Sequence, residues 1–295
     1  GEVAAFPTET VYGLGADAAN SDAVLKIYET KGRPRFNPLI VHCADLGMAE
    51  TLAVFRPLAR RLAERFWPGP LTLVLPRKDG ARVCDIVTAG LDTVGLRVPG
   101  HPVARELIRA AGLPLAAPSA NPSGRLSPTT AGQVRRAFGD RVPVLDGGPC
   151  AAGLESTILA VNGDDVVQLR AGALSRDEIE AFLERPVAVA SADSPVSAPG
   201  MLASHYAPKA KLRLNAVEPE AGESYLAFGP GPVSATGRSL NLSQAGDLRE
   251  AARNLFAMLH ALDRDEGTIA VAPIPEEGLG EAINDRLRRA AAPKK

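Results

Sequence analysis

A cluster of cations lies in the segment KGRPRFNPL, where Lys31, Arg33 and Arg35 fall within five residues. An arginine guanidinium matches phosphate oxygens in pairs and a lysine ammonium supplies a point charge, so the cluster is typical of a phosphate clamp. Pro34 and Pro38 restrict the backbone of the segment that would present these groups. A solvated basic loop is the alternative interpretation, because runs of surface charge are usually only that.

A second candidate segment, APSANPSGRLSPTT, gathers hydroxyl and amide side chains in a loop that follows an expected strand. These side chains belong to Ser119, Asn121, Ser123, Ser127 and Thr129. Short hydroxyls and free backbone N–H groups bind phosphate oxygens or a small polar ligand. Serine, asparagine and proline also form ordinary turns, and by itself the segment favours that simpler interpretation.

Two further arginines, Arg97 and Arg170, each stand at the end of an expected strand before a glycine or proline turn. Ligands of α/β sheets bind beyond the strand ends, so both are candidate ligand contacts, with a plain surface role as the alternative. Residues 155–157 make one more polar turn that leads into a strand. No nucleophile paired with a base emerges from these clusters. Cations, hydroxyls and glycine turns instead indicate an enzyme that positions phosphate and stabilises its charge.

Several other kinds of site are excluded or disfavoured. Gly13, Gly15 and Ala18 have the spacing of a dinucleotide-binding motif, but PTET separates them from the preceding strand and Arg35 stands where an acidic ribose ligand is expected. A tight glycine turn without a ligand is the alternative there. The sequence contains no P-loop, zinc-protease or serine-hydrolase signature. Its four histidines and three cysteines lack the spacing of a zinc site, so we expect no protein-bound metal.

The composition is that of an ordinary folded chain. Of 295 residues, 45% are hydrophobic, and 33 basic residues nearly balance 34 acidic ones, so no overall positive field attracts nucleic acid or an anionic membrane. No apolar run approaches the roughly 18 residues of a membrane helix. Three separated cysteines without a C-x-x-C pair fit a reducing compartment, so we expect a cytoplasmic protein with no membrane partner. The chain begins at Gly1 inside an expected strand, so we also expect a short preceding segment.

The elements that must position these residues alternate between strand and helix patterns, which predicts an α/β architecture. Strands are expected at residues 2–6, 38–41, 71–75, 94–98, 115–117, 142–145, 157–161 and 166–169, and helices at 22–30, around 58–66, around 103–108 and from 175. A stretch rich in Ala, Ser, Pro and Gly then interrupts the pattern. We therefore predict a large domain at 1–187, a linker at 188–208 and a smaller α/β domain at 209–295. The smaller domain has expected strands at 211–215, 225–228 and 268–272, and helices at 247–262 and 280–291.

Taken in order, eight segments resemble the threonylcarbamoyl-AMP synthases that have a YrdC-like catalytic domain and a smaller C-terminal domain. They are AFPTETVYGLGAD, KGRPRFNPL, LTLVLP, GLRVPGHP, APSANPSG, ESTILAV, LRAGAL and PGMLASHYAP. The resemblance covers nearly the whole chain. It implies that L-threonine, bicarbonate and ATP give L-threonylcarbamoyladenylate, pyrophosphate and water, the first step of threonylcarbamoyladenosine formation on tRNA. It also implies a twisted mixed sheet with a concave, positively charged pocket, and a Rossmann-like C-terminal domain.

The same resemblance implies the residues that contact each ligand. For threonine these are Thr10, His42, Arg97, the backbone at Ala117, and Ser156, with Arg97 as the partner of the carboxylate. For ATP these are Lys31, Arg33, Asn37, Thr93, Ser119, Ser127, Arg170 and, from the linker, Tyr206. Lys31 and Arg33 would be catalytic, because cations offset the repulsion between a carbamate anion and the α-phosphate and stabilise the departing pyrophosphate. Mg²⁺ is expected with the triphosphate, held mainly by substrate oxygens and water.

The resemblance also implies partners, and it has one departure. The product would pass to proteins that transfer the threonylcarbamoyl group to tRNA, with tRNA contact as a further option. Relatives commonly carry basic residues after Pro-Gly-Met, where this chain has Leu202, Ala203 and Ser204. A cationic contribution from a linker that covers the site is therefore in doubt.

Other functions stay open on the sequence alone. A non-catalytic module that binds double-stranded RNA is one, because YrdC-like domains have a basic concave face. The near-neutral charge and 4% aromatic residues argue against base stacking as its main role. A nicotinamide-dependent oxidoreductase that uses Gly13 and Gly15 is another. Carbamoyl transfer within a larger maturation protein is disfavoured because the zinc-finger cysteines expected there are missing.

Overall fold

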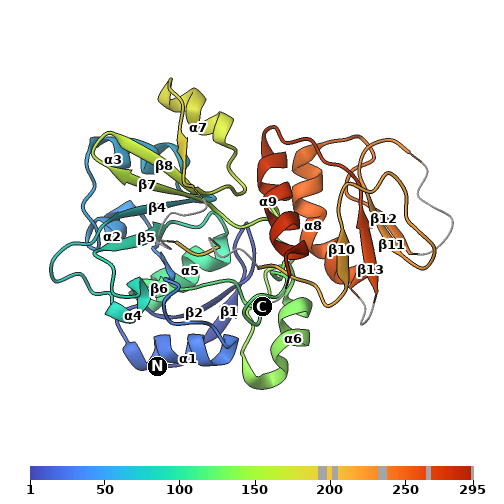
Figure 1. Cartoon of the computed structure of the whole chain (residues 1–295). Coiled ribbons are helices and arrows are strands. Elements are labelled where there is room, and N and C mark those ends of the chain that lie inside the picture. Colours follow the sequence, from blue (N-terminus) through green and yellow to red (C-terminus); the bar gives the residue numbers. More distant parts are fainter. Residues whose placement is uncertain (192–197, 201–204, 232–237, 264–266, 294–295) are drawn as a thin grey trace.

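Two β-sheets, each packed against helices, organise the protein (Figure 1). The computed structural model describes residues 1–191, 198–200, 205–231, 238–263 and 267–293. Within these residues the domain built on a nine-stranded mixed sheet contains most of the chain, and a four-stranded parallel sheet lies in the C-terminal part. The prediction of an α/β fold with a second, smaller domain is therefore confirmed.

The large sheet brings the ends of several central strands together on one side, which is called the sheet edge below. Its strands are β1 (Ala4–Phe6), β2 (Gly13–Asp17), β3 (Ile40–His42), β4 (Leu71–Pro76), β5 (Thr93–Arg97), β6 (Leu115–Ala116), β7 (Thr157–Asn162), β8 (Asp165–Arg170) and β9 (Ala188–Val189). Their order across the sheet is β1-β2-β6-β3-β5-β4-β7-β8-β9. β3 is parallel to β5, and β4 is antiparallel to β5 and parallel to β7. The carboxyl ends of β3 and β5 consequently meet the amino ends of β4 and β7.

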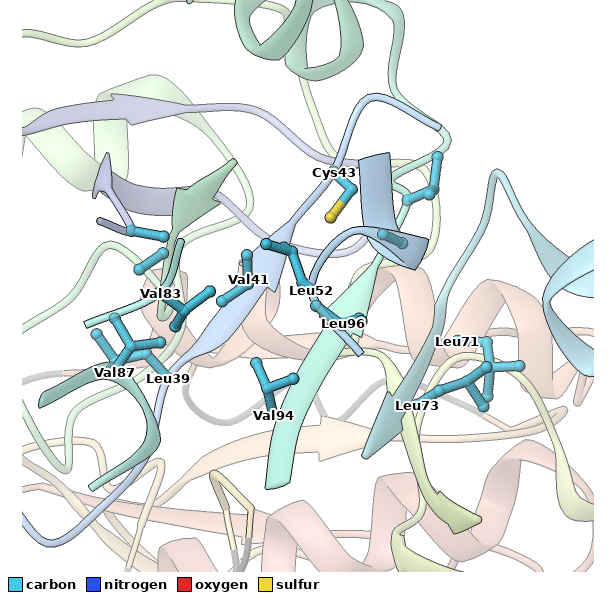
Figure 2. Packing of buried hydrophobic residues seen from close by; sticks show 14 of the residues in the cluster. Leu39, Val41, Cys43, Leu52, Leu71, Leu73, Val83, Val87, Val94 and Leu96 are labelled. Carbon is cyan, nitrogen blue, oxygen red and sulfur yellow. The ribbon is translucent and has the colours of Figure 1, made fainter. Parts of the chain in front are cut away.

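Side-chain alternation gives the central strands a core face and an opposite face. On the core face, Val41 of β3, Leu71 and Leu73 of β4, and Val94 and Leu96 of β5 pack in the main hydrophobic cluster (Figure 2). Because successive side chains of a strand point to opposite faces, the intervening residues point to the other side. That side carries Ile40, His42, Thr72, Val74, Gly95 and Arg97.

Helices of the large domain cover the sheet and carry the loops that reach its edge. They are α1 (Ser21–Lys31), α2 (Leu46–Glu50), α3 (Pro57–Phe66), α4 (Asp85–Thr88), α5 (Pro102–Ala111), α6 (Ala131–Phe138), the 3₁₀ turn η1 (Gly139–Arg141) and α7 (Arg176–Leu183). α1 begins where the Asn20 side chain accepts from the Ala23 amide, and it ends at Gly32, whose φ of 60° lies in the left-handed region. This C-cap turns the chain immediately after Lys31 and so directs Arg33 toward the sheet edge.

The smaller domain is a parallel sheet backed by two long helices. Its strands are β10 (Lys211–Arg213), β11 (Ser224–Ala227), β12 (Ser239–Asn241) and β13 (Thr268–Val271), in the order β10-β13-β11-β12. The helices are α8 (Leu248–Leu262) and α9 (Leu279–Ala291), which lie between this sheet and the large domain (Figure 1). This parallel sheet, with α8 between β12 and β13, agrees with the Rossmann-like domain that the resemblance implies.

The two domains share one buried hydrophobic cluster. Val11, Leu126 and Leu154 of the large domain are buried together with Leu255 and Phe256 of α8. An interface that excludes water over apolar side chains of both parts holds the domains in a fixed relation. Loops of the large domain that carry candidate site residues are therefore braced from behind by α8 and α9.

At Gly153 the two domains meet backbone to backbone. Its φ is 72°, and a Cβ built there would lie 2.4 Å from the carbonyl oxygen of Arg253 in α8. No side chain fits between the two main chains at this point, so glycine is required both for its conformation and for its lack of a side chain.

The structure corrects two local predictions. Residues 142–145, expected as a strand, make one bridge, between Val144 and Ala5. Pro143 has no amide hydrogen to donate, which prevents a continuous ladder. Gly13 and Gly15 lie within β2 rather than in a turn, so both the glycine-turn and the dinucleotide-loop interpretations are wrong. Gly15 is needed for space, because a Cβ there would lie 2.5 Å from the ring of Phe6.

The predicted linker is only partly without regular structure. β9 pairs with β8 and extends the large sheet to Val189, beyond the predicted end of the large domain at residue 187. Residues 198–200 and 205–208 are described and approach the edge of the large sheet. Across the described residues, no helix is long and apolar enough to cross a membrane.

Candidate functional site

A cavity that is partly open to solvent lies where β3 and β5 end and β4 and β7 begin. Its walls also include the segment before β2, the loop after β6 and the linker. Nine of the residues predicted from the sequence line it, namely Thr10, Arg33, His42, Arg97, Ala117, Ser119, Ser156, Arg170 and Tyr206. Residues separated by up to about two thirds of the chain thus meet in one hollow.

Strand register explains why three of these residues are neighbours. His42 pairs with Arg97 across β3 and β5, and the antiparallel register of β4 and β5 brings Thr72 opposite Arg97. The Thr72 hydroxyl lies 2.8 Å from the hydroxyl of Ser156, which immediately precedes β7. The mixed pairing of four strands therefore builds one polar row along the sheet edge.

Arg97 is buried and held on three sides. Its Nη1 donates to the Thr10 hydroxyl at 2.9 Å, and its Nε donates to the Gly69 carbonyl at 3.2 Å. Its Nη2 forms an ion pair with Glu9 at 2.7 Å. These contacts fix the plane of the guanidinium, so a carboxylate that enters the cavity meets an oriented cation.

His42 presents a neutral imidazole beside Arg97. Burial, followed by the charge of Arg97, lowers the pKa of His42 to about 3. The ring packs edge-on against Phe6, with 6.1 Å between the ring centroids. Its Nδ1 is buried and has no hydrogen-bond partner among the described residues. His42 can therefore donate or accept one hydrogen bond without adding charge.

Lys31 stands behind the cavity wall instead of lining it. Its ammonium donates to the carbonyl of Ser119 at 2.6 Å and to the carbonyl of Asn121. Burial, followed by the charge of Arg33, lowers the pKa of Lys31 well below its usual value. Lys31 thus supports the loop after β6 from the end of α1, and it brings positive charge to the Ser119 side of the cavity.

Arg33 lines the cavity and is oriented by its own loop. Its Nε donates to the Asn37 carbonyl at 3.3 Å and its Nη2 donates to the Pro38 carbonyl at 3.0 Å. Burial lowers the pKa of Arg33 to about 10, so it remains a cation near neutral pH. Asn37 does not line the cavity; it contributes a carbonyl that holds Arg33. Arg35, in the same loop, is exposed and does not line the cavity.

Arg170 closes the cavity on the side of β8. Its Nη2 donates to the carbonyl of Ser156 at 2.7 Å and to the hydroxyl of the same residue at 3.2 Å. Its Nη1 donates to the carbonyl of Pro199 in the linker at 3.2 Å. Arg170 therefore joins the start of β7 to the linker.

Ser127 and Glu155 form a polar pair at the back of the cavity. The Ser127 hydroxyl donates to Oε1 of Glu155, whose Oε2 forms an ion pair with Arg286 at 2.8 Å. Burial acts to raise the pKa of Glu155, but Arg286 and Arg170 outweigh it and hold that pKa below its usual value. Glu155 is thus ionised, and each of its carboxylate oxygens has a partner. Ser127 does not line the cavity itself and is connected to it by this hydrogen bond to Glu155.

The linker covers the apolar floor of the cavity. Ala198 is buried in one cluster with Ile40, Val74 and Ile158, which belong to the face of the sheet opposite the main core. Tyr206 is also buried, and its ring centroid lies 4.1 Å from that of His205. The prediction about Leu202, Ala203 and Ser204 falls outside the described residues.

Thr93, predicted as an ATP contact, does not line the cavity. It begins β5, whereas Arg97 ends that strand, which separates the two by about 13 Å at the usual rise per residue. The two share a face of the sheet with Gly95 between them, so Thr93 can reach only a ligand that extends along this floor.

Nine further residues line the cavity although they were not assigned to the threonine or ATP site. They are Thr8, Val11, Gly13, Ile40, Pro118, Glu155, Pro199, Gly200 and His205. Thr8 and Glu155 lie within motifs that were recognised, PTET and EST, so polar residues adjacent to the chosen ones could have been included. Val11 and Ile40 are apolar and match no functional motif, so only their place in the folded structure identifies them as cavity residues.

Comparisons with known proteins agree with this arrangement. Residues 1–172 match the Sua5, YciO and YrdC family described as telomere recombination, and residues 174–292 match the family described as threonylcarbamoyl-AMP synthase, C-terminal domain. The threonylcarbamoyl-AMP synthase of Bacillus subtilis is 43% identical over 98% of this chain and 89% of its own. That of Pyrococcus abyssi is 41% identical over 99% and 91%.

A solved structure extends the similarity to three dimensions. The crystal structure of P. abyssi Sua5 complexed with L-threonine has a TM-score of 0.89 and 39% identity, and the match covers 98% of this chain and 90% of that one. Both domains and the connection between them are included in a match of this extent. The chain belongs to the threonylcarbamoyl-AMP synthase family, in the form that carries the C-terminal domain.

Proposed function

We propose that this protein is an L-threonylcarbamoyladenylate synthase. It would convert L-threonine, bicarbonate and ATP to L-threonylcarbamoyladenylate, pyrophosphate and water, and so supply the modification of tRNA with threonylcarbamoyladenosine. The observation that carries the proposal is the single cavity that holds Thr10, His42 and Arg97 next to Arg33 and Arg170. Such a cavity can bind an amino acid and a polyphosphate as neighbours.

The threonine subsite would lie along the row at the sheet edge. The carboxylate would meet the oriented guanidinium of Arg97, which it would share with Glu9. His42, with its neutral ring and unpartnered Nδ1, and Thr10 supply hydrogen bonds to polar groups of the amino acid. The Ala117 backbone and Ser156 would complete the subsite. The complex of P. abyssi Sua5 with L-threonine supports this choice of ligand.

ATP would occupy the half of the cavity between the loop after β6 and the linker. Arg33, Arg170 and Ser119 face this half and suit phosphate oxygens. The apolar floor formed by Ile40, Val74 and Ile158 suits the base or ribose, and in this conformation Ala198 occupies it. Residues 198–200 must therefore shift when the nucleotide binds, and Thr93 would contact it only at the far end of the floor.

The chemistry would depend on charge stabilisation by Lys31 and Arg33. The threonine nitrogen bonds to the carbon of bicarbonate, water leaves, and a carbamate oxygen then attacks the α-phosphorus as pyrophosphate departs. Two anions must approach each other in this step, and fixed cations lower the barrier. Lys31 and Arg33 both remain bound to neutral carbonyls, so their charges are not cancelled before substrate arrives.

Magnesium would enter with the triphosphate. Of the described residues that line the cavity, Glu155 supplies a carboxylate, and both of its oxygens already have partners. The residues present therefore suit a cation held by phosphate oxygens and water, which is the usual manner for Mg²⁺ on a nucleotide. When bound, the ion would neutralise part of the phosphate charge.

The product would pass to proteins that transfer the threonylcarbamoyl group to tRNA. We place this reaction in the cytoplasm on the basis of cysteine usage, and no residue of the described chain identifies the acceptor. Direct contact with tRNA would be compatible with the open side of the cavity.

Pyrophosphate release measured with each substrate omitted tests the proposal. The complete mixture should release pyrophosphate, and omission of threonine or of bicarbonate should reduce the rate at least tenfold. Release that does not require threonine would contradict the proposed reaction. Binding of double-stranded RNA with no pyrophosphate release in any mixture would favour the non-catalytic alternative.

A further inference from the structure

Arg286 of α9 is a charged side chain that the fold buries completely, with 0% of its side chain exposed. It belongs to the C-terminal domain, yet it reaches the back wall of the cavity in the large domain. A buried guanidinium loses its hydration, and apolar residues of similar volume would often stabilise such an interface equally well. Stability alone therefore gives no reason for an arginine at this position.

The contacts of Arg286 reach two residues of the cavity wall, Glu155 and Tyr206, and the residue that follows Arg170. Its Nε pairs with Oε2 of Glu155 at 2.8 Å, and its Nη2 donates to the carbonyl of Ala171 at 2.9 Å. Its guanidinium carbon lies 4.9 Å from the centroid of the Tyr206 ring. Asp285 pairs with Nη1 at 2.6 Å and fixes the remaining side of the guanidinium.

Each of these contacts continues to a residue that lines the cavity or supports it. Glu155 lines the cavity and accepts from the Ser127 hydroxyl. Ala171 follows Arg170, whose guanidinium donates to Ser156. One side chain from the C-terminal domain thus links the loop after β6, the start of β7 and the end of β8.

Tyr206 carries a second, independent sign of restraint. Its φ is 62°, in the left-handed region that a tyrosine seldom adopts. Backbone strain of this kind persists when surrounding contacts hold the residue in place. Arg286 over one part of the ring and Phe256, with 5.8 Å between ring centroids, provide such contacts from the C-terminal domain.

We propose that Arg286 is a positioning residue through which the C-terminal domain sets the shape of the catalytic cavity. It orients the carboxylate of Glu155, which accepts from Ser127, and it packs on the ring of Tyr206 in the cavity wall. Arg170 separately donates to the linker at Pro199. The proposal rests on the proposed function for its kinetic readout. Since Arg286 touches neither substrate, it acts only through these neighbours.

The test compares Arg286→Met and Arg286→Lys with Arg288→Met, a control on the same helix whose side chain is 56% exposed. We expect Arg286→Met to lower kcat/KM for ATP by about 10- to 100-fold, as for the loss of an oriented charge at an active site. Arg286→Lys should recover part of this loss because it restores a cation beside Glu155. Arg288→Met should stay within about twofold of the parent.

A double variant separates positioning from stability. Arg286→Met leaves Glu155 buried and unpaired, so its thermal midpoint should fall, and adding Glu155→Gln should restore that midpoint. If Arg286 positions the cavity, kcat/KM stays low in the double variant although stability returns. Recovery of kcat/KM together with the midpoint, or parental kinetics in Arg286→Met, would overturn the proposal.

Failure of the proposed function is distinguishable from failure of this inference. The parent and Arg288→Met report on the reaction itself, whereas only the variants at 286 report on positioning. ATP affinity measured by calorimetry gives a readout that does not require turnover. It should weaken in Arg286→Met and in the double variant, and unchanged affinity in both would contradict positioning of the nucleotide half of the cavity.

Discussion

The buried cations of the cavity bind backbone carbonyls far more than carboxylates. Lys31 donates to the carbonyls of Ser119 and Asn121, and Arg33 donates to those of Asn37 and Pro38. A carbonyl orients a cation without cancelling its net charge, whereas a carboxylate would do both. At the scale of single residues, the charges of Lys31 and Arg33 therefore stay available for anionic substrates, whereas that of Arg97 is shared with Glu9.

Lys31→Met should lower the rate of adenylate formation by about 100-fold or more. The change removes a fixed charge and also the support of the Ser119 loop, both of which act on the phosphate. Pyrophosphate release at saturating substrate measures the effect. Lys26→Met, on the exposed face of the same helix, is the matched control. A folded Lys31→Met variant whose rate is within about threefold of the parent's would show that Lys31 has no catalytic role.

His42 should make stability depend on pH below neutrality. Its folded-state pKa of about 3 lies below the unfolded value of 6.5, so the unfolded chain takes up a proton first as pH falls. The free energy of unfolding then decreases from about pH 6.5 toward pH 3. His42→Asn should lessen the decrease between pH 7 and pH 5 by about 2 kcal/mol, measured by urea unfolding at each pH. Equal decreases in both proteins would show that His42 is not held neutral.

At the scale of elements, the alternation of the central strands decides which residues form the site. β4 and β5 turn their leucines and valines to the core and turn Thr72 and Arg97 to the opposite face. The segment after β8 then passes close to the start of β7. At Gly172 it comes so near that a Cβ would lie 2.4 Å from the amide nitrogen of Thr157.

Gly172→Ala should destabilise the protein by about 1–3 kcal/mol and reduce activity, because the collision is with backbone that cannot rotate away. Displacement of Ser156 would also disturb its bond to Arg170. Gly132→Ala in α6 is the control, since a Cβ there meets nothing closer than 3.8 Å and alanine favours a helix. Urea unfolding and pyrophosphate release on the same samples provide the measurements. Equal stability of the two variants would show that the turn can relax.

Local patterns predicted most elements to within two residues, as for α1, β4 and α9, because periodicity and caps act over short distances. β2 escaped prediction since its glycines, which make room for Phe6, lower strand propensity. α6 begins at a capping box of Thr130 and Gln133, and Thr130 is the last residue of the segment interpreted as a loop. The site residues followed from family motifs, and the structure brings nine of them together.

The remaining part of the site could not be predicted because it depends on tertiary contacts. Glu155 and Arg286 are separated by 131 positions, and neither motif context nor composition indicates that they pair. The support that Lys31 gives to the Ser119 loop spans 88 positions and is likewise absent from any local pattern. These links arise only when two sheets and their helices pack.

For the whole molecule, the shared hydrophobic cluster makes the two domains one folding unit. Val11, Leu126 and Leu154 complete the core around α8, and α9 supplies the buried partner of Glu155. Removal of the C-terminal domain would expose these apolar side chains and leave a buried carboxylate without its cation. The smaller domain therefore contributes to the stability of the large domain in addition to covering the site.

Deletion of everything after Pro208 should lower both the thermal midpoint and the yield of adenylate. The remaining domain would lose the contacts that hold Tyr206, and water would reach a labile product. Calorimetry and chromatographic quantification of the adenylate measure the two effects. Undiminished product yield from the shortened chain would exclude a covering role for the linker and the C-terminal domain.

The meeting of main chains at Gly153 has a consequence for how the two halves of the protein can be separated. At this point only main-chain atoms of α8 approach, so changes to its side chains leave this one contact as it is. A single methyl group added at position 153, in contrast, would act as a wedge at their closest point. Side chains of increasing size at this one position would therefore separate the large domain from α8 by increasing amounts.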